Sequence, residues 1–458
     1  MWNNKLYNFE CLPFGIASAP RIFTKIMKVV FSHVRQLGIS SFFYIDDSLL
    51  QAFCFEQAKR NTHFVNDLIE SLGFSINIEK SNFIPSQRTM FLGFIIDSVL
   101  FKVFLPEDKI QKIIEISYKV FERKITQIRT VAQLIGLYSS SYHAITLAHL
   151  QHRYLDIDKT KALQKSFKNF NAHMSLSVES KNEILWWIQN IKKENGCPIR
   201  QEPPKVYLQT DASLIGWGAV FEKDCTQGRW NIDECQNHIN VLELKAIILA
   251  LQALCRSVKD CHICVRTDSA VAVAYINNQG GSILSLLKLA KEIWFWSTER
   301  KVFISAVHIP GKQNIQPDNL SRQFNDSSEW KLNSSVFEKV TLSLFNPEID
   351  LFASRLNKQL PKYVSWFPDP EAYASDAFSL SWSNLLPYIF APFSQLPRVL
   401  QKIEEDKLVV YRNCMVDQED QLWFFYVHVM MYLAFLRDEW FLDIPFGFLQ
   451  QEFADIWS

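Results

Sequence analysis

The sequence lacks an apolar run long enough to cross a membrane. Its longest run, LWFFYVHVMMYLAFL, extends from Leu422 to Leu436, contains His428 and is followed by three charged residues. A transmembrane helix needs about 18 to 20 consecutive apolar residues. The run therefore predicts a buried helix, and no membrane partner is expected.

The sequence also lacks a disulfide framework. Its nine cysteines are odd in number and scattered from Cys11 to Cys414, and no signal-peptide pattern precedes them. This usage predicts an intracellular protein, in the cytoplasm or the nucleus. The CHIC segment from Cys261 to Cys264 has zinc-like spacing, but no second pair follows it. We interpret these two cysteines as core residues.

The chain has no net charge, but its charges are unevenly distributed. Residues 1–200 contain 25 Lys and Arg against 17 Asp and Glu, whereas the remainder contains 23 against 31. A basic first part suits a polyanionic partner, and a solvated basic surface is the ordinary alternative. A length of 458 residues predicts about three domains.

The first hundred residues have an α+β pattern. Apolar residues at helical spacing precede Gly38 and Gly73, which predicts two helices that end at these glycines. Between them, FFYIDDSLL places Asp46 and Asp47 inside an apolar, strand-like run. A hairpin turn is the ordinary interpretation of such a pair. Because the apolar flanks predict buried arms, a carboxylate site for Mg²⁺ is the alternative.

A second domain is expected after the proline-rich segment CPIRQEPP. Its pattern of strands and helices predicts a mixed sheet with flanking helices, and NVLELKAIILALQAL is interpreted as an amphipathic helix. Four acids interrupt apolar segments at spacings of 32, 25 and 50 residues: Asp211, Glu243, Asp268 and Asp318. Each alone is an ordinary surface or capping carboxylate. Together, at the carboxyl edge of a sheet, they predict two divalent cations for phosphoryl displacement.

These segments resemble a known family. YLQTDASLIGWGAVF, NVLELKAIILAL, VRTDSAVAVAYI and HIPGKQNIQPDNLSR are similar, in order and spacing, to the ribonuclease H domain of retroelement polyproteins. The resemblance implies that Asp211, Glu243, Asp268 and Asp318 are catalytic ligands of two Mg²⁺ or Mn²⁺ ions. It also implies an RNA–DNA hybrid as substrate. His308 precedes the last loop and receives no role.

The first part resembles the palm of a reverse transcriptase, on LPFGIASAPRIFTKIM, YIDD, NIEKSNFIP and MFLGFIID. The resemblance implies that Asp46 and Asp47 are catalytic carboxylates of a second two-metal site, acting on an RNA template and a DNA primer. It further implies that the FLG segment is a strand that grips the primer. The implied nucleic-acid and nucleotide contacts are Pro13, Phe14, Gly15, Tyr44, Lys80, Leu92 and Gly93.

Polymerase chemistry in that family needs a further carboxylate upstream of LPFG. Only eleven residues precede this motif, and Glu10 is their one acid. We therefore expect an N-terminally truncated fragment without polymerase activity.

Two segments, one from EWKLNSSVFEK to DAFSLSW and the other YIFAPFSQLPRVLQKI, resemble the methylase-like region of DIRS-type retrotransposons, which implies a separate tyrosine recombinase as partner. DLFASRLN lacks glycine, and Ala391 stands where a proline would be expected, so the region is interpreted as degenerate. The expected domains are a partial palm (1–104), a helical thumb or connection (105–202), a ribonuclease H-like domain (203–323), a linker (324–345), a small α/β methylase-like tail (346–412) and a C-terminal helical segment (413–458).

The fold class expected overall is a multidomain combination of α+β and α/β parts. The expected function is metal-dependent hydrolysis of RNA in RNA–DNA hybrids, with the basic first part adding salt-sensitive affinity. Two alternatives stay open. One is a non-catalytic nucleic-acid-binding relic of a retroelement, and the other is a silent fragment destabilised by an exposed palm core.

Overall fold

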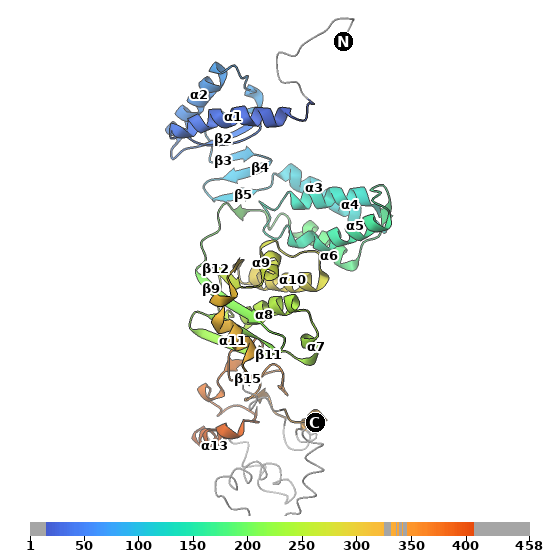
Figure 1. Ribbon diagram of the computed structural model, residues 1–458, viewed down its shortest axis with the longest axis vertical. Coiled ribbons are helices and arrows are strands. Elements are labelled where there is room, and N and C mark those ends of the chain that lie inside the picture. The colour runs from blue at the N-terminus through green and yellow to red at the C-terminus, as the bar shows by residue number, and fades with distance from the viewer. Residues whose placement is uncertain (1–14, 325–330, 336, 339–340, 342–345, 407–458) are drawn as a thin grey trace, which may run out of the picture. The chain divides into compact units, whose positions relative to one another are not determined.

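The computed structural model describes residues 15–324, 331–335, 337–338, 341 and 346–406. Two compact units divide between Gln201 and Glu202 (Figure 1). Both units combine helices with several small sheets, which confirms the mixed, multidomain fold class. No helix in these described ranges is long and apolar enough to cross a membrane. The predicted buried helix at residues 422–436 lies outside them.

The first unit begins with two helices on a hairpin. These elements are α1 (Ala19–Gln36), β1 (Ser40–Tyr44), β2 (Asp47–Gln51) and α2 (Phe55–Ser71). Each helix ends two residues before a glycine in the left-handed region, Gly38 at φ +81° and Gly73 at φ +84°. A glycine at this position ends a helix without steric cost. Both predicted helix ends are therefore confirmed.

The hairpin is covered on one face only. Phe43 stacks on Phe31 of α1 at a centroid distance of 4.9 Å. Side chains alternate along a strand, so Phe42 and Tyr44 point to the opposite face, and they are 53% and 60% exposed. The expected hairpin is confirmed, but the expected burial of both its arms is wrong. In the described residues, α1 and α2 cover one face of the β1–β2 hairpin and leave the other face exposed.

A second sheet follows, in the order β3–β4–β5–β8. Its strands are β3 (Arg88–Phe91), β4 (Phe94–Asp97), β5 (Lys102–Phe104) and β8 (Cys197–Pro198). Leu92 at φ +50° and Gly93 at φ +74° form the two-residue turn between β3 and β4. The FLG segment was expected to be a strand throughout, and this is wrong for its last two residues. Two consecutive left-handed residues end the strand and reverse the chain.

Replacing Leu92 with Asn is expected to stabilise the first unit by about 1 kcal/mol. Asn adopts the left-handed conformation at lower cost than Leu, and Asn-Gly is the preferred pair for this turn. Leu92 is 44% exposed, so little apolar burial is lost. Urea unfolding of the full chain measures the effect. Leu100→Asn, also at an exposed site but without positive φ, should give no gain. Equal effects of the two changes would contradict the turn argument.

Helices make up most of the rest of the first unit. They are α3 (Glu107–Phe121), α4 (Ile128–Ser139), α5 (Arg153–Lys165) and α6 (Val178–Asn190), with a short pair of strands, β6 (Thr126–Gln127) and β7 (His173–Met174). At their centre, the fully buried rings of Tyr138 and Trp187 stack at 4.2 Å. The Trp187 indole donates a 2.8 Å hydrogen bond to the Gln151 carbonyl. This region is helical, as the sequence predicts.

The second unit is built on a five-stranded sheet in the order β11–β10–β9–β12–β13. The strands are β9 (Val206–Ala212), β10 (Gly216–Phe221), β11 (Asp224–Arg229), β12 (His262–Thr267) and β13 (Phe303–His308). Neighbours among β11, β10 and β9 are antiparallel, whereas β9, β12 and β13 run parallel. The predicted mixed sheet is therefore confirmed, although β11 was not anticipated.

Five helices accompany this sheet: α7 (Ile232–Cys235), α8 (Ile239–Leu254), α9 (Ala270–Asn277), α10 (Leu284–Glu299) and α11 (Ile315–Arg322). Helix α8 lies between the sheet and α10, and nearly all its residues from Leu242 to Leu251 are buried. Its interpretation as an amphipathic helix is therefore wrong. Helix α10 covers the face that would otherwise be solvated, and the sequence analysis did not anticipate α10.

The described tail contains short parallel strands around a small core. These are β14 (Ile349–Asp350), β15 (Val364–Ser365), β16 (Ala374–Ser375) and β17 (Pro387–Tyr388), followed by α13 (Leu396–Glu405). The fully buried Trp382 lies in this core, and its indole donates a 2.9 Å hydrogen bond to the Ala377 carbonyl. The domain limits and the methylase-like interpretation stay predictions.

Candidate active site in the second unit

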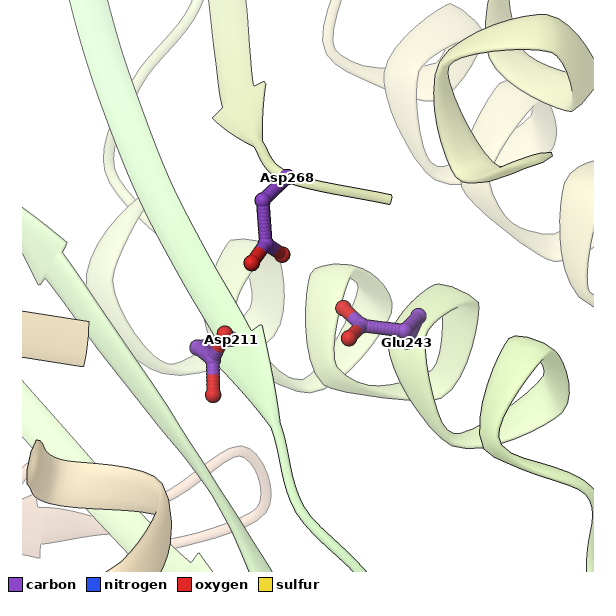
Figure 2. A group of neighbouring side chains, drawn as sticks. All are labelled: Asp211, Glu243 and Asp268. Carbon is purple, nitrogen blue, oxygen red and sulfur yellow. The ribbon is translucent and has the colours of Figure 1, made fainter. Parts of the chain in front are cut away.

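Two parallel strands and one buried helix bring three acids together. Asp211 lies near the end of β9, and Asp268 directly follows β12, the parallel neighbour of β9. Carboxyl ends of parallel strands share one edge of a sheet, and α8 carries Glu243 to this edge. One carboxylate oxygen from each residue lies within 4.8 Å of the other two. Figure 2 shows the carboxyl groups of Glu243 and Asp268 directed toward the space beside Asp211.

Burial makes this cluster electrostatically costly. Asp211 and Glu243 are 3% and 7% exposed, and Asp268 is the most exposed of the three. Burial, with the charges of Asp211 and Asp268, raises the pKa of Glu243 to about 9. Burial also raises the pKa of Asp211 to about 6, although a hydrogen bond from Ser321 opposes the shift. The cluster therefore favours a cation or protons between its oxygens.

The donor set fits a divalent cation. All three residues offer carboxylate oxygens, the ligands that Mg²⁺ prefers. Oε2 of Glu243 is buried and has no hydrogen-bond partner among the described residues. Buried polar atoms are normally satisfied, so an orphaned carboxylate oxygen facing two other carboxylates is a free ligand position. Asp211, Glu243 and Asp268 could therefore hold a metal ion.

Asp318 lies beside this group. It occupies the first turn of α11, and its side chain is 41% exposed. Its Oδ1 accepts a 2.7 Å hydrogen bond from Nε of Arg322, one turn further along the helix. Asp318 is not part of the three-residue group, but its charge helps to raise the pKa of Asp211. The structure thus brings three of the four predicted acids together and keeps the fourth nearby.

Two further residues hold Asp211, and both were missed in the sequence. The Ser321 hydroxyl donates to Oδ2 of Asp211 at 2.7 Å, and Nδ2 of Asn314 lies 3.3 Å from Oδ1. Ser321 and Asn314 are fully buried. Ser321 stands three residues after Asp318 in α11, so helical spacing places the two residues close together, and Asn314 directly precedes the helix. That spacing was the available signal.

Glycines allow the surrounding segments to approach closely. A Cβ on Gly218 of β10 would lie 2.5 Å from both Cβ of Leu320 and the carbonyl oxygen of Pro317. Only glycine therefore lets α11 pack directly on the sheet. Similarly, a Cβ on Gly311 would lie 3.2 Å from Oδ2 of Asp268, so the loop after β13 passes the outer carboxylate of the cluster.

The predicted palm site is arranged differently. Asp46 and Asp47 are exposed at the hairpin turn, and the described residues place no third acid, histidine or cysteine with them. Lys80 is exposed at the end of a short 3-10 helix (Ile78–Lys80). Gly15 has a left-handed φ of +91°. Pro13 and Phe14 lie outside the described residues, and the positions of Tyr44, Leu92 and Gly93 are given above.

The chain is similar in sequence to one described family and to several polyproteins. Residues 1–96 match the family described as reverse transcriptase (RNA-dependent DNA polymerase). Polyprotein P3 of Commelina yellow mottle virus is 24% identical over 364 residues, which cover 73% of this chain and 18% of the viral protein. The enzymatic polyprotein of Figwort mosaic virus (strain DxS) is 23% identical over 345 residues, or 70% of this chain and 46% of that protein.

A transposon protein and two solved structures are also similar. The retrovirus-related Pol polyprotein from transposon opus of Drosophila melanogaster is 30% identical over 93 residues, 20% of this chain and 9% of that protein. The foamy viral protease-reverse transcriptase, solved with RNA/DNA hybrid, is 14% identical and covers 70% of this chain and 42% of its own, with a TM-score of 0.36. LC11-RNase H1, also solved with RNA/DNA hybrid, is 23% identical and covers 25% of this chain and 93% of its own, with a TM-score of 0.23.

The chain spans less than half the length of each of these curated relatives. The family match covers the first 96 residues of this chain. The matches with the two viral polyproteins cover about 70% of it. Residues 1–96 thus match the reverse transcriptase family, and the chain is similar in sequence to viral and transposon polyproteins.

Proposed function

We propose that the second unit is a metal-dependent nuclease that hydrolyses the RNA strand of RNA–DNA hybrids. The convergence of Asp211, Glu243 and Asp268 carries the proposal, together with a buried oxygen of Glu243 that has no hydrogen-bond partner in the part of the chain that the structure describes. Divalent ions held there would supply activation of an attacking water and stabilisation of the leaving oxygen. The resemblance of the four acid-bearing segments to ribonuclease H supports this choice of substrate.

The chain's own residues have distinct parts in this proposal. Asp211 and Glu243 form the buried wall of the site, and Asp268 forms its more exposed side. Ser321 and Asn314 fix the carboxylate plane of Asp211, so its remaining lone pairs keep one direction. Contacts with the 2′-hydroxyl groups would distinguish RNA from DNA, and the basic first part would add sequence-independent affinity.

A cleavage assay with the full chain tests the proposal. The substrates are a labelled RNA–DNA hybrid, the same RNA alone and the same duplex as DNA, each in Mg²⁺ and in excess EDTA. We expect cleavage of the RNA only in the hybrid and only with metal. A folded protein that cleaves no hybrid in Mg²⁺ or Mn²⁺ would overturn the proposal. Retained, strongly salt-dependent hybrid binding would then favour the nucleic-acid-binding relic.

Ser321→Ala is expected to raise the Mg²⁺ concentration for half-maximal cleavage by about tenfold. The hydroxyl donates directly to Asp211, and its loss frees that carboxylate to rotate away from the cluster. The measurement is a Mg²⁺ titration of hybrid cleavage. Ser297→Ala is the matched control, because Ser297 is equally buried on α10 and its hydroxyl donates to the Trp294 carbonyl, away from the acid cluster. Identical titrations for the two variants would contradict a positioning role for Ser321.

The polymerase site and the retrotransposon type are predictions from the sequence. Asp46 and Asp47 remain a predicted metal site for an RNA template and DNA primer. The DIRS type and a tyrosine recombinase partner rest on the resemblance of the tail alone.

A further inference from the structure

A buried ion pair joins the described tail to the domain that contains the five-stranded sheet. Arg355 lies in the loop after β14, and its Nη1 and Nη2 donate to the two carboxylate oxygens of Glu234 at 2.8 and 2.9 Å. Nη2 also donates to the Arg229 carbonyl at 3.2 Å. The side chains of Glu234 and Arg355 are 5% and 16% exposed. A two-pronged guanidinium–carboxylate pair of this kind is both strong and geometrically specific.

Glu234 connects this contact to the rest of the domain. Its backbone N–H bonds to Oδ1 of Asn231 at 2.7 Å and its Oε2 accepts from the Asn231 N–H at 2.9 Å, which caps α7. Nζ of Lys245 lies 2.7 Å from its Oε1. Burial by itself would raise the pKa of Glu234, but hydrogen bonds from Arg355 and Lys245 lower it to about 2. The carboxylate is therefore held charged by donors from three segments.

Two other side chains of the domain also reach the tail. Nη1 of Arg256, just after α8, donates to the Ala372 carbonyl at 2.6 Å, and the Thr226 hydroxyl of β11 donates to the Pro368 carbonyl. The contacted loop is itself ordered by Asp369, which accepts hydrogen bonds from the Arg355 backbone N–H at 2.9 Å and from a buried tyrosine hydroxyl at 2.6 Å. Together with the Arg355–Glu234 pair, these hydrogen bonds attach the tail to the domain at three points.

The Arg355–Glu234 pair is connected to the candidate active site through α8. Lys245, which binds Glu234, is two residues after Glu243 on α8. We propose that residues 349–376 are an intramolecular clasp of the nuclease domain, and that Arg355 is a positioning residue that fixes α7 and the Glu243-bearing turn of α8. The clasp itself stands on the contacts, and only its effect on catalysis rests on the proposed function.

Hydrogen exchange of the full chain tests the clasp independently of activity. Arg355→Met leaves Glu234 buried and unpaired toward the tail, so amides of residues 232–245 should exchange about tenfold faster. Arg398→Met is the matched control, because exposed Arg398 lies in the same tail over the Phe378 ring and contacts no residue of the domain in the described structure. Unchanged exchange in Arg355→Met, or an equal change in Arg398→Met, would overturn the clasp.

A double variant distinguishes loss of the ion pair from a general failure to fold. Combining Arg355→Met with Glu234→Gln removes both charges, so exchange protection should recover relative to Arg355→Met alone. A double variant no better protected than the single one would overturn the pairing.

Mg²⁺ titrations of cleavage address the positioning role. Arg355→Met should raise the half-maximal Mg²⁺ concentration about tenfold and leave kcat at saturating Mg²⁺ nearly unchanged. A loss of kcat alone would overturn the positioning role. A parent chain without cleavage, but with the expected exchange changes, would remove the nuclease proposal and leave the clasp intact.

Discussion

Asp268→Asn is expected to lower kcat for hybrid cleavage by about a thousandfold or more. The change removes one charged ligand from a cluster of three whose oxygens lie within 4.8 Å. A metal ion contributes several kcal/mol of transition-state stabilisation, and about 4 kcal/mol corresponds to a thousandfold in rate. Asp268 is the most exposed member of the cluster, so the near-isosteric amide should fold normally. Single-turnover cleavage of labelled hybrid in saturating Mg²⁺ measures the effect.

The matched control is Asp46→Asn. Asp46 is also an aspartate next to a strand, but it is exposed in the turn between β1 and β2 of the first unit. If hydrolysis depends on the second unit alone, this variant should cleave the hybrid as fast as the parent. Hydrolysis that survives Asp268→Asn and is lost in Asp46→Asn would assign the chemistry to the other predicted site. Hydrolysis unaffected by either change would indicate a contaminating nuclease.

Glu243→Gln is expected to stabilise the metal-free protein by about 1 to 3 kcal/mol at pH 7.5, although it should abolish cleavage. Glu243 is 7% exposed, faces two other carboxylates and leaves one oxygen without a partner among the described residues. At pH 7.5 the raised pKa of Glu243 means that the side chain must take up a proton when the metal-free chain folds. The neutral amide keeps the shape and removes this free-energy cost. Urea unfolding in EDTA measures the gain. Glu299→Gln, whose parent side chain is 75% exposed, should change stability little.

The same residue predicts how stability depends on pH. The native pKa of Glu243 is raised to about 9 from an ordinary value of 4.5, so between these values the native state binds more protons than the unfolded state. The free energy of unfolding of the metal-free parent should therefore fall as pH rises from about 5 to 9. The slope should be clearly smaller in Glu243→Gln. Parent stability that rises across this range would contradict the buried, uncompensated cluster.

Adding Mg²⁺ should make the parent more stable than Glu243→Gln. Mg²⁺ that binds only the native state raises the unfolding temperature of the parent, and the gain grows with concentration. Glu243→Gln lacks one of the proposed ligands, so Mg²⁺ should raise its unfolding temperature less. Differential scanning fluorimetry across a Mg²⁺ series measures both responses, and equal responses would contradict a ligand role for Glu243.

Local features could be predicted from the sequence because interactions between residues close in the chain determine them. Gly38 and Gly73 end helices where a left-handed residue is required. The apolar segments around Asp211 and Asp268 could be assigned to strands because strand periodicity is a property of a few residues. Asp211 and Asp268 then lie close together, since parallel strands share a carboxyl edge.

Features that depend on which surfaces meet were decided only by the tertiary structure. The sequence pattern of α8 suggested one buried face, but α10 covers the other. Phe42 and Tyr44 looked like core residues, yet α1 and α2 cover only the opposite face of their hairpin. Ser321 reaches Asp211 across 110 residues, and Arg355 reaches Glu234 across 121. Residue spacing alone carries no information about such contacts, because they arise when separately formed elements pack together.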